Sequence, residues 1–159
     1  MLNIEQLLRT PQVDSGLRFD ISPDGQRVIF SWNKTGRWEL YERQINASDS
    51  LRLVTEKQGA KFSPLHSPDG KLLVYALDPD GSESYHVYIY NFETNAHTDL
   101  TPQIAYAHQP NFSWSPDGQM LAVLSDMHGQ FALHRLPVDG TPGRLLKNVF
   151  RPTWDAKWS

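Results

Sequence analysis

Six histidines are the side chains in this chain that are best suited to binding a metal ion: His66, His86, His97, His108, His128 and His134. Two ligands on one strand need i, i+2 spacing, and two ligands on one helix need i, i+4 spacing, usually with carboxylates nearby. No two of these histidines lie at either interval. The sequence therefore predicts histidines that make ordinary hydrogen bonds in strands and loops, and it predicts no metal or other cofactor.

The acidic segment 78–84, DPDGSES, has some likeness to a calcium-binding loop. An EF-hand loop needs alternating oxygen ligands and a bidentate glutamate at its twelfth position, between two helices. Counted from Asp78, the twelfth position is Ile89, which lies in an apolar, strand-like run. We therefore expect a hairpin turn here.

Serine, histidine and aspartate are also the residue types of a catalytic triad, which is recognised by geometry and not by composition. The chain has no G-x-S-x-G pentapeptide, the motif that carries the nucleophile of α/β-hydrolases. It also has no cysteine, which excludes thiol catalysis, disulfides and cysteine-based metal sites. We therefore predict no catalytic residue.

Composition excludes several classes of partner. The chain has 159 residues, and 15 Lys+Arg against 18 Asp+Glu give a net charge of −3, which does not suit a nucleic-acid-binding protein. No apolar run approaches the roughly 18 residues of a membrane span, so no membrane partner is expected. The first residues, MLNIEQLLRTPQ, lack the basic and apolar regions of a secretory signal. Together with the absence of cysteine, this favours a cytoplasmic location.

The tetrapeptide Ser-Pro-Asp-Gly must organise the fold, because it occurs three times: at 22–25, 67–70 and 115–118. The intervals are 45 and 48 residues, and each copy is followed by an apolar strand-like run. Proline suits the second position of a type I turn, and glycine supplies the positive φ after it. Such a turn joins two antiparallel strands. The serines of these tetrapeptides are therefore explained as turn residues.

Four strands are expected in each period. They are 17–21, 26–32, 37–45 and 51–55 in the first, 61–66, 71–77, 84–92 and 97–101 in the second, and 110–114, 119–125, 130–136 and 144–149 in the third. Four antiparallel strands in every 40–50 residues are typical of a β-propeller blade. The predicted fold is all-β, with blades at about 13–56, 57–104 and 105–150. Residues 1–12 are expected to form a short helix, with Asn3 as its N-cap.

The last residues begin a fourth copy of the repeat. Ala156-Lys157-Trp158-Ser159 resembles Phe112-Ser113-Trp114-Ser115, which leads into the third tetrapeptide, at an interval of 44 residues. We therefore expect a fourth blade to start at 151–159. Three blades and a fraction fall short of the usual four to eight, so the ring is expected to be incomplete. Such a piece is expected either to associate with itself or to belong to a longer polypeptide.

These repeats resemble those of bacterial TolB-type propellers and of the prolyl oligopeptidase family of serine peptidases. The opening residues 4–14, IEQLLRTPQVD, run directly into the first repeat and are similar to the start of acylaminoacyl-peptidase-like members. The resemblance implies a propeller that gates peptide access to a downstream α/β-hydrolase domain carrying the catalytic triad. No catalytic residue of the family can be placed in this chain, so the chain by itself is not expected to be an enzyme.

A TolB-like scaffold that binds protein partners without catalysis is the alternative function. In either case the strand before each tetrapeptide is expected to be the innermost of its blade and to line the central channel. Polar residues of those strands and of the adjoining loops would then be the ones to touch a peptide: Arg18, Asp20, His66 and His108. Most tryptophans and tyrosines are expected to pack between blades.

Overall fold

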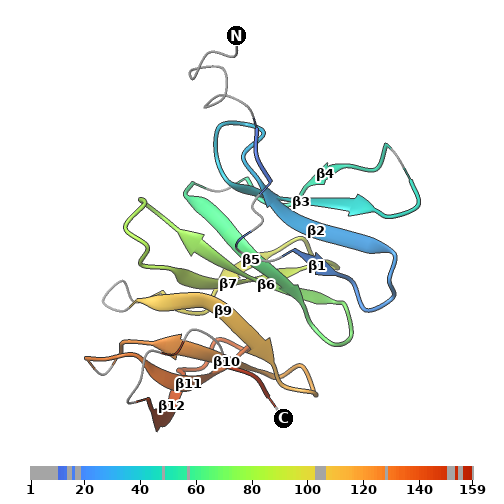
Figure 1. Ribbon diagram of the computed structural model, residues 1–159. Coiled ribbons are helices and arrows are strands. Elements are labelled where there is room, and N and C mark those ends of the chain that lie inside the picture. The colour runs from blue at the N-terminus through green and yellow to red at the C-terminus, as the bar shows by residue number, and fades with distance from the viewer. Residues whose placement is uncertain are drawn as a thin grey trace.

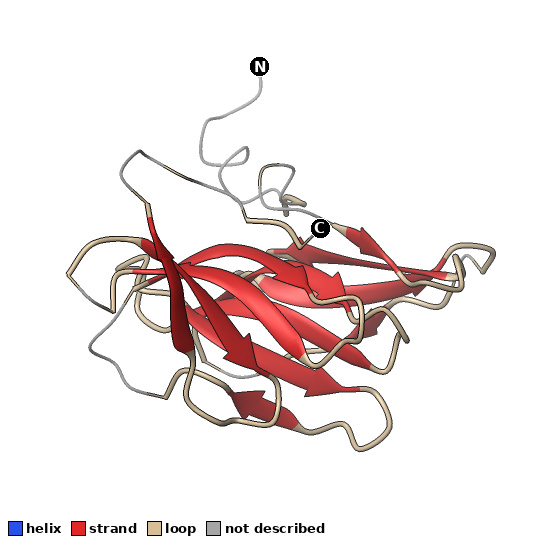
Figure 2. Ribbon diagram, turned by 90° about the horizontal axis from the view of Figure 1, so that it is seen from below, coloured by secondary structure: helices blue, strands red, loops and turns tan. Residues whose placement is uncertain are grey.

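The computed structural model describes residues 11–13, 16, 19–47, 49–56, 58–102, 107–127, 129–149, 153 and 156–158. The helix expected at the N-terminus, the candidate residue Arg18 and His128 lie outside these residues. The described part contains strands and turns and no helix (Figure 2).

Twelve strands form three four-stranded antiparallel sheets (Figure 1). The first sheet contains β1 (Asp20–Ile21), β2 (Arg27–Trp32), β3 (Glu39–Gln44) and β4 (Arg52–Leu53). The second contains β5 (Ala60–His66), β6 (Leu72–Asp78), β7 (His86–Asn91) and β8 (His97–Asp99). The third contains β9 (His108–Trp114), β10 (Met120–Ser125), β11 (Ala132–Pro137) and β12 (Arg144–Asn148). In each sheet the strands follow chain order, which confirms the predicted all-β propeller architecture.

The repeated tetrapeptide forms the same turn in each sheet. The N–H of Gly25, Gly70 and Gly118 donates to the carbonyl of the serine three residues earlier, at 2.8–2.9 Å, and φ of each glycine is close to +70°. Each serine hydroxyl also donates to the aspartate two residues later, at 2.5–2.6 Å. These serine hydrogen bonds lower the pKa of Asp24, Asp69 and Asp117 below the ordinary 3.8. The turn therefore fixes the start of the second strand of each sheet.

The sheets pack face to face, and the second lies between the other two. Apolar side chains that alternate along each strand fill both layers. The layer between the first and second sheets contains Ile29, Leu40, Val54, Leu73, Tyr75, Leu77 and Tyr90. The layer next to the third sheet contains Val74, Ala76, Val87, Ile89, Leu100, Phe112, Trp114, Leu121, Val123 and Leu136. No described strand of the first sheet contacts one of the third, so the sheets form an open arc.

Gly59, which lies outside the repeated tetrapeptides, occupies a tightly packed position just before the second sheet. Gly59 precedes β5 with φ of +91°, and a Cβ there would lie 2.5 Å from the carbonyl oxygen of Asp78 and 3.0 Å from the Cα of Pro79. Both contacts are with backbone, which cannot rotate away. The position therefore requires glycine for space as well as for conformation.

We expect Gly59→Ala to lower the free energy of unfolding by about 2–3 kcal/mol, through backbone strain and overpacking. Gly81→Ala is the matched control, because φ there is +85° and no atom lies within 4 Å of the added Cβ. The control should lose only about 1 kcal/mol, the cost of the left-handed conformation. Urea unfolding of both variants measures the difference, and equal losses would show that the contact with Asp78 is relieved at little cost.

Candidate functional site

Two of the polar residues predicted to contact a peptide meet at the seam between the first and second sheets. Asp20 of β1 accepts a hydrogen bond from the backbone N–H of His66 in β5, at 2.7 Å, and its Oδ2 lies 2.8 Å from His66 Nδ1. With Asp20 as acceptor, Nδ1 is the donor of this pair. The His66 side chain is only 1% exposed, whereas that of Asp20 is 21% exposed. His66 therefore joins two sheets, and only Asp20 offers surface to a ligand.

The His66 ring is held in place by an aromatic neighbour. Phe92, at the end of β7, stacks on it with ring centroids 5.5 Å apart, and the Arg27 guanidinium lies 4.9 Å from the Phe92 centroid. Arg27 also pairs with Glu42 at 3.2 Å, and Glu42 pairs with Arg52 at 2.8 Å. This seam can bind two sheets together, but it brings no nucleophile to the His66–Asp20 pair.

The three serines that directly follow the predicted innermost strands are hydrogen-bonded within their own turns. The hydroxyls of Ser22, Ser67 and Ser115 donate to aspartates of their own turns, as described above. A serine nucleophile needs a base that accepts its proton, and a carboxylate within a turn is a poor substitute for a histidine. These three hydroxyls are therefore turn donors, as the sequence predicts.

His108, the other candidate, lies between the second and third sheets. It begins β9, pairs through its backbone with Tyr85, and is 4% exposed. It lines a cavity of about 220 Å³ together with Leu100, Thr101, Pro102, Met127, Leu136, Gly140, Pro142 and Gly143. Burial lowers the pKa of His108 from 6.5 to about 4, so its imidazole is neutral at physiological pH. The site is mostly apolar and suits packing better than proton transfer.

The calcium-like segment is a turn closed by its own carboxylate. Asp78 accepts hydrogen bonds from the backbone N–H of Gly81 at 2.8 Å, of Glu83 at 3.2 Å and of Asp80 at 3.3 Å. These bonds occupy both oxygens of a side chain that would otherwise be the first metal ligand. Throughout the described residues, no group of three or more His, Asp or Glu side chains is arranged to hold a metal ion.

A described segment at the C-terminal end contacts the third sheet in the way that the second sheet contacts the first. His66 and Trp114 each precede the serine of a tetrapeptide, and each bonds to the preceding sheet: His66 to Asp20, and Trp114 through Nε1 to the Leu65 carbonyl at 3.2 Å. Trp158 likewise donates its backbone N–H to Ser113 Oγ of the third sheet, at 3.2 Å. Trp158 thus contacts the third sheet at the position where His66 of β5 contacts the first.

Comparison with known protein families decides the classification. The family model described as the TolB beta propeller domain matches residues 17–157. This chain belongs to the TolB beta propeller domain family. The matched residues contain all three tetrapeptides and all twelve strands, so the family assignment and the observed fold agree.

The relatives of this TolB-type propeller include TolB itself. The Tol-Pal system protein TolB of Francisella tularensis subsp. mediasiatica is 32% identical over 80 residues, which is 50% of this chain and 18% of that protein. The structure of TolB from Acinetobacter baumannii aligns with a TM-score of 0.65 and 28% identity, over 80% of this chain and 31% of the other. The chain therefore spans less than a third of the length of these relatives.

Peptidases share the same fold. The structure of a puromycin-hydrolysing peptidase of Mycobacterium tuberculosis aligns with a TM-score of 0.70 over 91% of this chain and 26% of that one, at 18% identity. At that identity the likeness shows the fold alone. The fold of this TolB-type propeller is thus similar both to that of TolB and to part of this peptidase.

Proposed function

We propose that this chain is the non-catalytic propeller portion of a cytoplasmic serine peptidase of the prolyl oligopeptidase family. In that role it restricts the access of peptides to an α/β-hydrolase domain encoded elsewhere in the same protein. The observation that carries the proposal is the opening segment 4–14, whose acylaminoacyl-peptidase-like sequence directly precedes the first repeat of the sequence. The propeller of the mycobacterial peptidase supports it as a precedent for this fold in an enzyme.

The gating role is supported by the hydrogen bonds and the burial of the serine and histidine side chains in this chain. The tetrapeptide serines bond within their turns, and the His66 side chain is buried against Asp20 and Phe92. A propeller built in this way supplies a rigid wall and excludes bulky substrates. The acyl-transfer chemistry would come from the hydrolase domain, with a histidine base and backbone N–H groups stabilising the oxyanion.

A TolB-like scaffold is the second candidate, and the 32% identity to Francisella TolB favours it. In that case the same surfaces would bind a protein partner, and no hydrolase domain would be present. The two candidates differ in chemistry, so one experiment on the full-length gene product separates them.

The experiment combines activity-based labelling with a peptidase assay. A fluorophosphonate probe should label one serine of the full-length protein, and acyl-aminoacyl and short peptide p-nitroanilides should be hydrolysed. Prior denaturation is the control and should abolish both signals. A folded full-length protein that is neither labelled nor active would contradict the peptidase assignment and leave the scaffold as the better account.

A further inference from the structure

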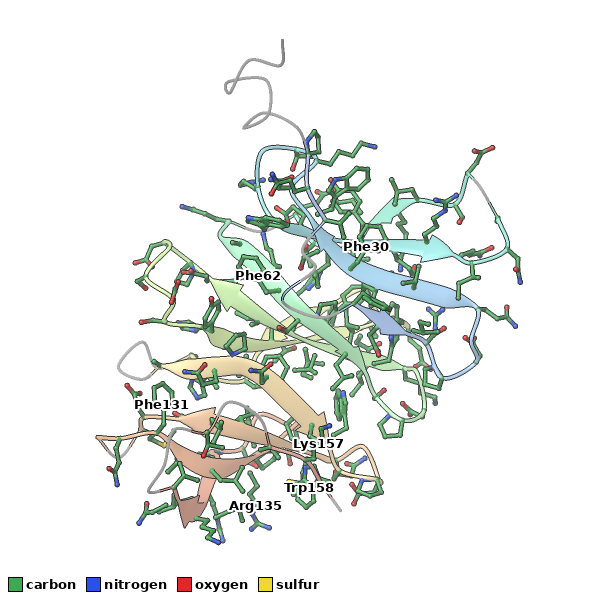
Figure 3. The ribbon with its side chains drawn as sticks, viewed as in Figure 1. Phe30, Phe62, Phe131, Arg135, Lys157 and Trp158 are labelled. Atoms are coloured by element: carbon green, nitrogen blue, oxygen red, sulfur yellow. The ribbon has the colours of Figure 1, made fainter. Side chains whose placement is uncertain are left out.

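Two arginines face each other on the side of the third sheet that points away from the second. Arg135 of β11 is directly opposite Arg144 of β12 in the strand register. Both line a cleft of about 400 Å³ with Met120, Pro137, Thr141, Pro142 and Gly143. Figure 3 shows Arg135 at the foot of the molecule, on the same side of this sheet as Trp158. Like charges directly opposite on neighbouring strands are destabilising. An anion bound between the two arginines would therefore stabilise the folded chain.

That anion is missing among the described residues. No described carboxylate forms an ion pair with Arg135 or Arg144. The nearest acidic residue along the chain, Asp139, accepts hydrogen bonds from the N–H and the hydroxyl of Thr141, at 2.9 and 2.8 Å. Its carboxylate is thus already used to close the β11–β12 turn.

The equivalent position differs between the other two sheets, because the second sheet has Ile89 and Thr98 there, whereas the first sheet has an ion pair. Counted through the strand register from two residues before the tetrapeptide serine, the row of the first sheet is Asp20, Ile29, Glu42 and Arg52. The corresponding row of the third sheet is Ser113, Ala122, Arg135 and Arg144. Arg144 therefore matches Arg52, whereas Arg135 stands where the first sheet has Glu42. In the first sheet the pair is a salt bridge of 2.8 Å, and in the third it is two cations.

This row is a seam between sheets. In the first sheet it contacts the second sheet at both ends, because His66 donates to Asp20 and the Arg52 guanidinium donates to the Tyr90 hydroxyl at 3.3 Å. In the third sheet the equivalent of the first contact is made by Trp158, which donates to Ser113. The end of the row that carries Arg135 and Arg144 has no such covering strand among the described residues.

We propose that the Arg135–Arg144 cleft binds a carboxylate, supplied by an acidic side chain of a protein segment that packs on this face of the third sheet. Two guanidinium groups present a planar array of donors that matches the two oxygens of a carboxylate. The incoming carboxylate replaces the one that Glu42 provides within the first sheet. The proposal is independent of whether the whole protein is a peptidase or a scaffold.

Glutarate, which reproduces a glutamate side chain, is the probe. At fixed ionic strength, millimolar glutarate should raise the melting temperature of the 159-residue chain by several degrees, because a ligand that binds only the folded state stabilises it. Arg135→Gln and Arg144→Gln should each abolish the rise. Lys71→Gln is the control, because it removes one cation from an exposed pair with Glu93 and should keep the rise. An equal rise in all four proteins, or a larger rise with inorganic phosphate, would overturn the proposal.

A charge reversal provides an independent test with the opposite sign. Arg135→Glu recreates the cross-strand pair of the first sheet, so it should raise the melting temperature without any ligand and abolish the response to glutarate. A lowered melting temperature together with a retained response would contradict the proposal. In the wild-type chain the NMR signals of the Arg135 and Arg144 Nε–Hε groups should shift on adding glutarate. This measurement needs no variant to fold, and unchanged signals would also count against the site.

Discussion

Replacing Glu39 with glutamine should lower the free energy of unfolding by about 3–5 kcal/mol, the usual cost of leaving one member of a buried ion pair without its partner. Glu39 of β3 pairs with Lys61 of β5, with Oε2 and Nζ 2.9 Å apart. The two side chains are 2% and 0% exposed. In the variant the ammonium of Lys61 would stay buried without a counter-charge.

The pair belongs to a network that joins the first two sheets. The Thr55 hydroxyl donates to Glu39 Oε2 at 2.7 Å and accepts from the Leu40 N–H at 2.9 Å. Lys61 also donates to the Gly59 carbonyl at 2.9 Å. A break at Glu39 therefore affects the backbone of both sheets as well as one charge.

The control and the double variant distinguish burial from simple charge loss. Glu42→Gln removes a carboxylate whose partners Arg27 and Arg52 have side chains 26% and 45% exposed, so it should cost only about 1 kcal/mol. Glu39→Leu combined with Lys61→Met should lie within about 2 kcal/mol of the wild type, because no buried charge remains. Urea unfolding at pH 7 measures all three. A loss below 1 kcal/mol for Glu39→Gln would contradict the account.

The pH dependence gives a second signature of the same pair. Burial already lowers the pKa of Lys61 below 10.5, and Glu39 opposes that shift. Without Glu39 the pKa should fall further, so the unfolded state binds more protons than the folded state over a wider range below 10.5. Stability of Glu39→Gln should therefore rise as the pH increases from 7 towards 10.5, more steeply than that of the wild type.

The turns and the number of strands could be predicted because their signals are local. Proline, aspartate and glycine in sequence dictate one turn, and Gly25, Gly70 and Gly118 all have the positive φ that this turn requires. The apolar run that follows each turn then indicates the second strand. The first innermost strand is shorter than predicted, since only Asp20–Ile21 forms a described ladder within 17–21.

The contacts between sheets could not be predicted, because they join residues far apart in the chain. Nothing local to Lys61 indicates that it lies beside Glu39 in another sheet, and a lysine in a strand is ordinarily exposed. Gly59 is distinguished from other turn glycines only by the approach of Asp78, nineteen positions later. Asp20 and His66 were predicted as polar residues of innermost strands, and the structure brings them together. It buries His66, however, because that side chain lies in the seam between the first and second sheets, against Asp20 and Phe92.

Acidification from pH 6.5 to pH 4 should destabilise the chain through His108, by up to about 3 kcal/mol for a shift of this size. The folded pKa of about 4 lies below the ordinary 6.5, chiefly because of burial. The hydrogen bond with the Tyr85 backbone is the next largest effect and favours the charged form, His86 and His134 oppose it, and Asp126 favours it least strongly. Between these two pH values the unfolded state binds the proton and the folded state does not, so stability falls as the pH falls.

His108→Gln should flatten this part of the stability profile, because glutamine keeps a polar side chain of similar length that does not titrate. The aspartates of the turns, whose pKa values lie below 3.8, begin to lose their stabilisation below about pH 5, but they do so equally in the variant and in the wild type, so the difference between the two profiles reports His108. Urea unfolding between pH 4 and 7 gives the slope, and an NMR titration of the His108 ring gives its pKa directly. An unchanged slope in the variant, or a ring that protonates near pH 6.5, would mean that the seam between the second and third sheets admits water to His108.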